Sequence, residues 1–300
     1  MKILVITSSI DYTVDYIISK YADVDFYRVN LDLLDQYRFL ISLDGWSIDS
    51  NSGKIKDNQV RSIYYRKPML PYLGHFETSY QAMIGQDIMS MVNGIVDAFE
   101  GLVLTKPSVL RVTENKIYQM QTLRKLGVPF PTSLIGNVPD MDLGIEAGEK
   151  IIKPLTQGKL DLGDQFEFFQ TSVLASSVGD ISLTPVYIQE RIEKGYEVRL
   201  TCLNEYLWPV RIESSDSVDW RTISAENKYE VITVPHHIRE TCMKVMEELG
   251  LRFGAFDFIV KPNGEWIFLE INPNGQWLWL EKLLDLDISN RLVELLKGGV

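Results

Sequence analysis

Short apolar runs, polar turns and amphipathic stretches alternate along the first hundred residues. The apolar, β-branched run at 2–8 is followed by helical spacing of apolar positions around Val14 to Tyr21. A strand, a turn and a helix in this order are typical of open sheets with parallel strands, so we expect an α/β fold here. Asp-Gly and Asn-Ser-Gly turns separate further short strands, predicted at 24–29, 39–43, 46–48 and 62–65, and a helix is predicted at 81–99.

A new unit opens at Pro107. From Thr113 to Gly127 the pattern predicts a helix, with Thr113 as its N-cap and Gly127 as its end. Trp277 and Trp279 alternate at strand spacing, and we expect them in the core rather than on a substrate platform. The other predicted elements are an extended link at 128–132, strands at 151–155, 186–189, 196–203 and 206–212, and helices at 174–178, 235–249 and 288–296.

Two strand-like segments near the C-terminal end carry the most informative side chains. Residues 253–260 and 267–274 are separated by Pro-Asn-Gly, which is typical of a hairpin turn. Glu270 and Asn272 are two apart and project the same way, and Asp257 can face them from the partner strand. These oxygen ligands, too few to enclose an ion, suit magnesium that also binds nucleotide phosphates. An exposed hairpin with scattered acids is the alternative, although an unpaired charge within an apolar run would be costly.

Composition narrows the class of protein. The 300 residues are 45% hydrophobic and 24% charged, enough for a globular fold of two or three packed layers. No apolar run approaches the length of a membrane span, and the strand-like start does not resemble a signal peptide, so we expect a cytoplasmic protein without a membrane partner. The net charge of -11 argues against a nucleic-acid surface. Cys202 and Cys242 are far apart and have no companion ligands, which favours buried free thiols over a disulfide or a zinc site.

The order of the polar residues from Pro107 to the C-terminus resembles that of the ATP-grasp ligases. In that family the nucleotide lies between two α+β lobes. The resemblance implies an α/β protein with a pre-ATP-grasp domain at 1–106, a first ATP-grasp lobe at 107–187 and a C-terminal lobe with the magnesium site at 188–300. The matching positions are Lys116, Lys153, Gln189, Glu190, Arg191, Ile192, Glu197, Arg211, Asp257, Glu270 and Asn272.

The resemblance implies that five cationic side chains bind phosphate groups. Lys116 and Lys153 would reach the α and β phosphates, because an ammonium suits a polyanion; the alternative for each is a surface lysine. Arg199, Arg211 and Arg221 are candidates for the γ-phosphate and an acyl phosphate. Arg211 ranks above Arg199, because its strand is otherwise apolar and Arg199 can instead pair with Glu197 or Glu213. The loop at 155–163 is expected over the phosphates, although it lacks a dense Gly-Ser run.

The same resemblance places the nucleoside against the segment at 189–192. Glu190 would accept from the adenine amino group, with Gln189 beside it, and the backbone of Arg191 and Ile192 would bond the adenine edge. Glu197 would accept from a ribose hydroxyl. The alternative for the two glutamates is a solvated pair of charges along the strand.

Further motifs resemble the graspetide, or microviridin-type, peptide macrocyclases and extend the likeness over nearly the whole chain. Ser-Ile-Tyr-Tyr-Arg-Lys-Pro (62–68) is similar to an aromatic-Tyr-Arg-Arg-Pro motif, with Lys67 in place of the second arginine. This makes Arg66 a candidate catalytic residue, and the alternative is a basic pair at a strand end. The segments 219–221 and 270–277 also look like that subfamily.

The subfamily resemblance implies an ATP-dependent ligase that forms ADP and phosphate. ATP would phosphorylate an Asp or Glu side chain of a ribosomal precursor peptide that carries a leader segment. A hydroxyl or amine of the same peptide would then close an ω-ester or ω-amide ring. ATP and two Mg²⁺ ions are the implied cofactors, a homodimer is the implied assembly, and Asp219 is a candidate base. Positioning and charge neutralisation carry most of such phosphoryl transfer.

Two other readings remain open. One is a RimK-like ligase that joins a free amino acid to a carboxylate of a protein or a small molecule. The other is a non-catalytic nucleotide-binding or peptide-binding module, which the intact set of Asp257, Glu270 and Asn272 disfavours.

Overall fold

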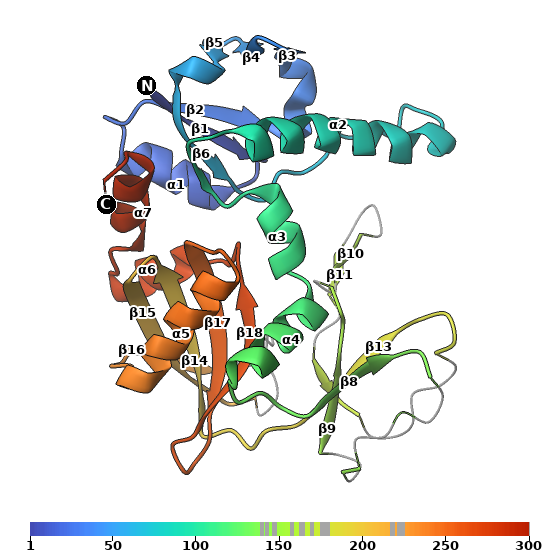
Figure 1. Ribbon diagram of the computed structural model, residues 1–300, viewed down its shortest axis with the longest axis vertical. Helices are drawn as coiled ribbons and strands as arrows, with labels where there is room; N and C mark the ends of the chain where they lie inside the picture. Colours follow the sequence, from blue (N-terminus) through green and yellow to red (C-terminus); the bar gives the residue numbers. More distant parts are fainter. Residues whose placement is uncertain are drawn as a thin grey trace. The chain divides into compact units, whose positions relative to one another are not determined.

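Contacts along the chain divide the protein into two units (Figure 1). The first comprises Met1–Arg111, Leu251–Phe253 and Pro273–Val300, and the second comprises Val112–Gly250 and Gly254–Asn272. The division into three domains at 1–106, 107–187 and 188–300 stays a prediction.

The computed structural model describes residues 1–138, 141, 144–145, 149–156, 159–161, 166–168, 171–174, 181–216, 220 and 226–299. Residues 175–178 of the predicted helix at 174–178, residues 157–158 and 162–163 of the loop at 155–163, and the candidates Asp219 and Arg221 lie outside these residues.

The first unit contains a parallel sheet and a small antiparallel sheet. The parallel strands follow the order β2-β1-β6-β7, and β3-β4-β5 form the antiparallel sheet. The alternation of strand, turn and helix therefore predicted this fold class correctly. The elements are β1 (Lys2–Thr7), α1 (Tyr12–Lys20), β2 (Phe26–Asn30), the 3-10 helix η1 (Leu31–Gln36), β3 (Tyr37–Ser42), β4 (Gly45–Ser50), β5 (Gly53–Lys56), η2 (Asp57–Gln59), β6 (Val60–Tyr65), α2 (Thr78–Ala98), β7 (Leu102–Leu104), α6 (Leu278–Leu284) and α7 (Ile288–Leu296).

One apolar core joins the two sheets of this unit to helix α2. Leu4 and Ile6 of β1 belong to the same buried cluster as Ile48 of β4 and Val92 and Val96 of α2. Their alternation along β1 places one face of the parallel sheet against this cluster. The C-terminal end of the chain is held to the same sheet, because the Ser62 hydroxyl of β6 donates to the Leu296 carbonyl of α7 at 2.7 Å.

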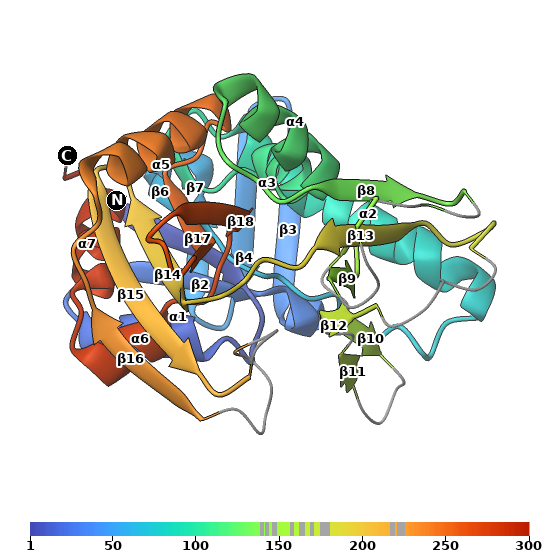
Figure 2. The same cartoon turned by 90° about the horizontal axis from the view of Figure 1, so that it is seen from below.

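The described residues of the second unit form three groups of strands (Figure 2). A four-stranded sheet has the order β12-β9-β13-β8, β10 and β11 pair as a hairpin, and a five-stranded sheet has the order β16-β15-β14-β17-β18. The elements are α4 (Lys116–Leu126), β8 (Ser133–Gly136), β9 (Lys150–Lys153), β10 (Lys159–Asp161), β11 (Phe166–Phe168), β12 (Ser172–Val173), β13 (Val186–Glu190), β14 (Tyr196–Leu203), β15 (Tyr206–Ser214), β16 (Asn227–Val231), α5 (His236–Glu248), β17 (Phe253–Val260) and β18 (Trp266–Asn272), with α3 (Pro107–Thr113) across the boundary of the two units.

Helix α5 packs on one face of the five-stranded sheet. A Cβ on Gly254 would lie 2.7 Å from Cδ1 of Ile271 and 3.1 Å from Sδ of Met246 in α5. This close approach of helix, β17 and β18 requires glycine. The side chains of β17 and β18 that point away from α5 are therefore the ones available to a ligand.

One of the two predictions for the ends of α4 was wrong. Asn115, and not Thr113, caps α4, because its side chain accepts from the backbone N–H groups of Ile117 and Tyr118. Thr113 instead ends a separate short helix, α3. Gly127 does end α4, with a left-handed φ of 67° that glycine adopts readily.

The segment after β18 was also predicted incorrectly. Strand spacing was expected at Trp277 and Trp279, but residues 278–284 form helix α6. Trp277 is fully buried, as expected of a core residue. Among the described residues, no helix is long and apolar enough to cross a membrane.

Candidate nucleotide and metal site

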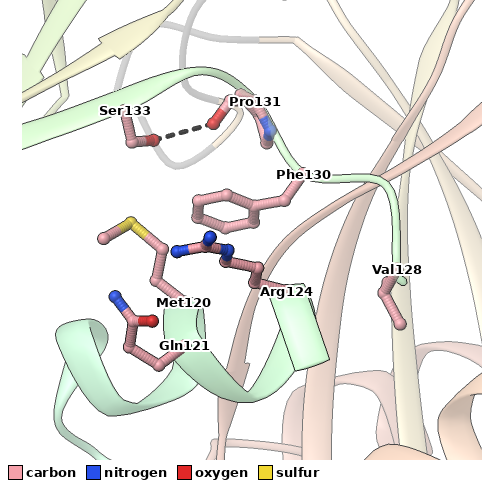
Figure 3. A pocket seen from close by; sticks show the side chains of 7 residues that line it. All are labelled: Met120, Gln121, Arg124, Val128, Phe130, Pro131 and Ser133. Carbon is pink, nitrogen blue, oxygen red and sulfur yellow. Dashed lines mark hydrogen bonds between the residues drawn. The ribbon is translucent and has the colours of Figure 1, made fainter. Parts of the chain in front are cut away.

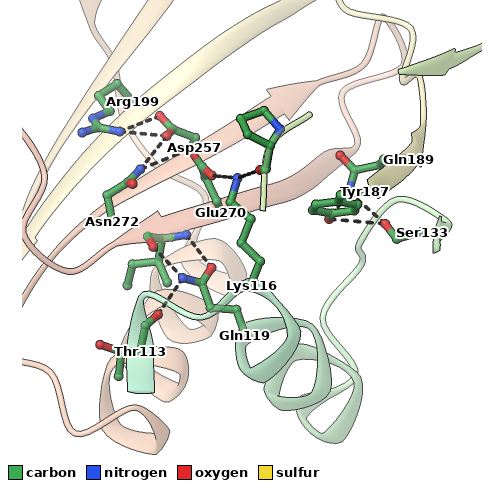
Figure 4. A network of polar contacts seen from close by, with 12 residues as sticks. Thr113, Lys116, Gln119, Ser133, Tyr187, Gln189, Arg199, Asp257, Glu270 and Asn272 are labelled. Carbon is green, nitrogen blue, oxygen red and sulfur yellow. Dashed lines mark hydrogen bonds and ion pairs between the residues drawn. The ribbon is translucent and has the colours of Figure 1, made fainter. Parts of the chain in front are cut away.

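The β17–β18 hairpin brings Asp257, Glu270 and Asn272 together, as the sequence predicted. The register pairs Asp257 with Glu270 and Ala255 with Asn272, so the three polar side chains project from one face. The Nδ2 atom of Asn272 donates to Oδ2 of Asp257 at 3.1 Å and to Oε1 of Glu270 at 3.3 Å (Figure 4). That these residues bind metal stays a prediction.

A β-bulge lies directly beside the two acids. Asp257 pairs with Glu270, but the next residue, Phe258, pairs with Phe268, so Leu269 is the extra residue. Bulges are frequent next to functional sites, where they redirect a side chain. Here the bulge separates the polar face at Glu270 from an apolar cluster that Leu269 forms with Ile192, Ile259 and Ile267.

Arg199 of β14 pairs with the buried acid of this set. Its Nη1 atom donates to both carboxylate oxygens of Asp257, at 2.9 and 2.8 Å. Each residue is less than a tenth exposed, at 7% for Arg199 and 8% for Asp257. The sequence predicted that Arg199 could pair with Glu197 or Glu213; the partner is Asp257, because β17 lies next to β14 in the sheet.

Arg211 projects from the other face of the sheet. It lies opposite Val198 in the β14–β15 pair, one residue from Arg199. Because opposite residues share a face and successive residues alternate, Arg211 and Arg199 point to opposite faces. Arg211 pairs with Glu213 and lies over the Tyr196 ring, with its Cζ atom 4.1 Å from the ring centroid. The sequence ranked Arg211 above Arg199 as a phosphate ligand, and the register favours the reverse order.

The two predicted phosphate lysines lie against one buried tyrosine. Lys153 is the register partner of Tyr187, and its Nζ atom is 4.8 Å from the ring centroid. The Nζ atom of Lys116 is 5.9 Å from the same centroid, 3.5 Å from Oε2 of Glu270, and donates to the carbonyl of Pro154 at 3.1 Å. The structure therefore connects the lysines to the acid set through Lys116.

Tyr187 was not identified from the sequence. It is 2% exposed, and burial raises the pKa of its hydroxyl to about 12, a shift that the Ser133 hydroxyl opposes. The Nε2 atom of Gln189 donates to the Tyr187 hydroxyl at 2.8 Å and to the Ser133 hydroxyl at 2.9 Å. Tyr187 therefore stays neutral at physiological pH and offers its ring face to the two ammonium groups. Only its position two residues before Gln189 on the same strand could have indicated this role.

The candidate adenine-binding segment is already partly bonded within the protein. The Glu190 carboxylate accepts from the N–H of Thr132 at 3.2 Å. The N–H of Arg191 donates to the carbonyl of Glu149 at 2.7 Å, so it is engaged in this structure. The side chain of Ile192 packs with Ile259, Ile267 and Leu269 in one apolar cluster.

Glu197 forms a buried ion pair, in contrast to the solvated charges that the alternative reading expected. The Nζ atom of Lys194 lies 2.7 Å from Oε1 of Glu197, and both side chains are 9% exposed. Lys194 also donates to the carbonyl of Asp216 at 2.8 Å. A ribose hydroxyl at Glu197 would therefore share the carboxylate with Lys194.

Two open cavities of about 450 and 440 Å³ border the segment at 190–195. The first is lined by Glu149, Arg191, Ile192, Glu193, Lys194, Gly195, Tyr196, Ser214 and Ser215. The second is lined by Ile145, Glu149, Glu190, Arg191, Ile192, Glu193, Lys261, Pro262 and Asn263. Their position favours this segment as the nucleoside side of the site.

A third cavity lies elsewhere, between α4 and the link to β8, and has a volume of about 350 Å³ (Figure 3). Its walls include Met120 and Arg124 of α4 and Phe130 of the link. None of its lining residues is among the predicted site residues.

Arg66 lies in the first unit and is buried, at 1% exposure. Its Nε atom is 3.2 Å from Oδ2 of Asp11, and its Nη2 atom donates to Thr13 at 3.2 Å and to Gln276 at 2.5 Å. Its Nη1 atom donates to Asn274 at 3.4 Å. These contacts join the end of β6 to the segment that follows β18. A catalytic role of Arg66 stays a prediction.

The donor set fits magnesium bound together with phosphate. Among the described residues, no three His, Cys, Asp or Glu side chains group as a metal site. Two carboxylates and one amide form an open set, which suits an ion that completes its shell with water and phosphate oxygens. Asn272 presents Nδ2 to the acids, so ligation requires its amide to turn over and present Oδ1.

Comparisons with known proteins give matches in structure. No protein-family model matches the sequence, and no curated protein matches it. The macrocyclase MdnC of Microcystis aeruginosa MRC, bound with precursor peptide MdnA, is 22% identical over 100% of both chains, with a TM-score of 0.87. A RiPP-associated ATP-grasp ligase of Chryseobacterium gregarium, in complex with ADP and a leader and core peptide, is 21% identical over 100% of this chain and 97% of that chain, with a TM-score of 0.86.

This protein has the ATP-grasp ligase fold. The mixed α/β fold expected from the sequence is thereby confirmed. The same fold is seen in the ATP-grasp ligase PsnB complexed with a phosphomimetic variant of its minimal precursor, Mg and ADP. PsnB is 19% identical over 99% of this chain and 98% of that chain, with a TM-score of 0.78. At these identities the likeness establishes the fold, and the chemistry rests on this chain's own residues.

Proposed function

We propose that this protein is an ATP-dependent peptide ligase that closes ω-ester or ω-amide rings in a ribosomally made precursor peptide. The observation that carries the proposal is the open set of Asp257, Glu270 and Asn272, with Lys116 3.5 Å from Glu270. It is supported by full-length similarity to ATP-grasp ligases solved with precursor, leader or core peptides.

The residues divide the work according to their chemistry. Lys116 and Lys153 would orient the phosphate groups, and the apolar surface at Ile192 would support the base. Asp257, Glu270 and Asn272 would hold Mg²⁺, which supplies neutralisation of the charge that develops on the phosphates. Two ions, and γ-phosphate contacts from Arg199 and Arg221, belong to the proposal, whereas Arg211 projects from the opposite face of the sheet and is the weaker candidate.

The proposed reaction has two steps. An oxygen of a peptide Asp or Glu carboxylate attacks the γ-phosphorus, the bond to ADP breaks, and an acyl phosphate forms. A hydroxyl or amine of the same peptide then attacks the acyl carbon, phosphate leaves, and the proton of the nucleophile is lost to a base. Asp219 remains the candidate base. A leader-containing precursor as partner, a homodimer and a cytoplasmic location complete the proposal.

The test is incubation of the purified protein with ATP, Mg²⁺ and candidate precursor peptides, followed by mass spectrometry. Ring closure lowers the peptide mass by one water per ring, and omission of Mg²⁺ should abolish the loss. Addition of a free amino acid to the acceptor would instead establish the intermolecular ligase reading. Absence of ATP consumption with every acceptor would favour the non-catalytic module.

A further inference from the structure

Strand β18 carries two of the three candidate metal ligands and stands at one end of its sheet. Among the residues that the structure describes, the strand order β16-β15-β14-β17-β18 gives β18 a single strand neighbour, β17. The outward N–H and C=O groups of such an edge strand need other partners when they are buried. Two points of this edge are covered from the α4 side of the unit. One is Phe268, whose N–H donates to the Pro129 carbonyl at 3.2 Å, and the other is Ile271.

The side chain of Gln119 takes the place of a strand neighbour at Ile271. Its Nε2 atom donates to the Ile271 carbonyl at 2.8 Å, and its Oε1 atom accepts from the Ile271 N–H at 3.1 Å. A planar amide presents a donor and an acceptor as a peptide group does, so it bonds both backbone groups of one residue. The second Nε2 hydrogen is donated to the Thr113 carbonyl at 2.7 Å. These bonds are drawn in Figure 4. Gln119 is 6% exposed, so they are shielded from water.

The bonded residue lies between two predicted ligands. Glu270 and Asn272 flank Ile271 and project from the opposite face, so the position of the Ile271 backbone sets where both side chains start. Gln119 stands three residues after Lys116 on α4, and residues at this spacing are neighbours on a helix surface. One amide therefore joins the helix that carries Lys116 to the strand that carries the acids.

We propose that Gln119 is a positioning residue for the magnesium–nucleotide site, holding Glu270 and Asn272 in register with Lys116. The inference rests on the proposed function, because it assigns Gln119 to the ligands of that site. It explains why a buried glutamine stands on α4 where an apolar residue would pack more simply. Loss of its bonds leaves the N–H and C=O of Ile271 without their partner and frees the strand to shift.

The test compares Gln119→Met, which keeps the side-chain length and removes the hydrogen bonds, with two controls. Gln121→Met makes the same change at an exposed position of the same helix. Leu123→Ala destabilises α4 by creating a cavity at a buried position without touching the Gln119 bonds. Gln119→Asn is the second test variant, because it keeps the amide and shortens its reach.

Two measurements separate positioning from stability. Hydrogen exchange of the ligand-free protein, read on a peptide covering 267–273, should be about tenfold faster at the Ile271 amide in Gln119→Met and Gln119→Asn. Calorimetric titration of a non-hydrolysable ATP analogue at increasing Mg²⁺ should require about tenfold more Mg²⁺ for half-maximal binding in both variants, as is typical for residues that orient metal ligands. Gln121→Met should match wild type in both, and Leu123→Ala should lower the melting temperature yet keep the wild-type Mg²⁺ requirement.

An unchanged exchange rate at Ile271 in Gln119→Met would overturn the inference, and so would an unchanged Mg²⁺ requirement. An equal increase in the Mg²⁺ requirement of Leu123→Ala would show that destabilisation of α4 alone causes the effect, and it would also overturn the inference. If wild-type protein bound the analogue without any Mg²⁺ dependence, the proposed function would fail, and the role assigned to Gln119 would fail with it.

Discussion

Arg199 and Asp257 form a buried pair in which one guanidinium nitrogen donates to both carboxylate oxygens, at 2.9 and 2.8 Å. The pair explains how an acid can stand in the apolar strand β17, since the guanidinium supplies the charge that a buried carboxylate requires. Asp257 is therefore both a candidate metal ligand and half of an ion pair that supports the fold. Glu270, on the partner strand, is more exposed, with 20% of its side chain accessible.

Removing one acid or the other should consequently have different effects on the free energy of unfolding. We expect Glu270→Gln to abolish turnover with little change in the free energy of unfolding. Asp257→Ala should abolish turnover and lower that free energy by about 3–5 kcal/mol, because it leaves Arg199 buried without its carboxylate. Urea unfolding and ADP release measure the two effects. Wild-type activity in either variant would refute the metal assignment, and an Arg199→Met, Asp257→Leu double variant should recover stability without recovering activity.

Tyr187 should contribute to ATP binding through its ring and not through its hydroxyl. Tyr187→Leu removes the aromatic face beside Lys116 and Lys153, which is worth about 1 kcal/mol or more for buried pairs, and should weaken ATP binding roughly fivefold. Tyr187→Phe keeps the face and should bind ATP within about twofold of wild type. Calorimetry with ATP measures both, and equal affinities of the Leu and Phe variants would contradict a role of the ring.

Lys153→Ala should weaken nucleotide binding more than peptide binding. The ammonium of Lys153 lies over Tyr187 at the end of β9, and a single positive charge there serves a polyanion better than a peptide chain. Separate titrations of ATP and of a precursor peptide provide the measurement. Unchanged ATP affinity would remove Lys153 from the phosphate site.

Arg66→Ala should act first on stability. Arg66 is buried and contacts Asp11, Thr13 and Gln276, so truncation leaves a buried acid unpaired and should cost about 3–5 kcal/mol in the free energy of unfolding. Arg66→Lys retains the charge but not the forked set of donors, and should fall between wild type and Arg66→Ala. If Arg66→Ala unfolds like wild type yet forms less cyclic product, the sequence-based catalytic role is favoured instead.

The two thiols should be unreactive in the folded protein. Cys202 and Cys242 are free and buried, and burial raises the pKa of Cys202 from 9.0 to about 12 and raises the pKa of Cys242 as well. A thiol reagent at pH 8 should label both only after denaturation. Because the unfolded thiols ionise first, stability should fall as the pH rises above about 9. Rapid labelling of the native protein would contradict this burial.

Local pattern predicted much of the fold and the grouping of Asp257, Glu270 and Asn272 on one hairpin. The terminal helix at 288–296 was predicted with its observed bounds, and the strands at 196–203 and 206–212 pair as expected. Periods of two and of 3.6 residues, together with turn residues, are encoded in neighbouring positions. The helix at 278–284 was not predicted, because a few alternating aromatic residues are compatible with both the strand period and the helix period.

By itself, the sequence determined that Glu270 and Asn272 share a face and that a Pro-Asn-Gly turn returns the chain toward Asp257, since both follow from spacing along one hairpin. Only the tertiary structure decided that Arg199 pairs with Asp257 and that Gln119 bonds Ile271, which are 58 and 152 residues apart. Contacts of that separation depend on strand order and on which helix covers a sheet edge. Strand order and edge coverage depend on packing of the whole unit, so they cannot be predicted from the hydrophobic pattern of a single segment.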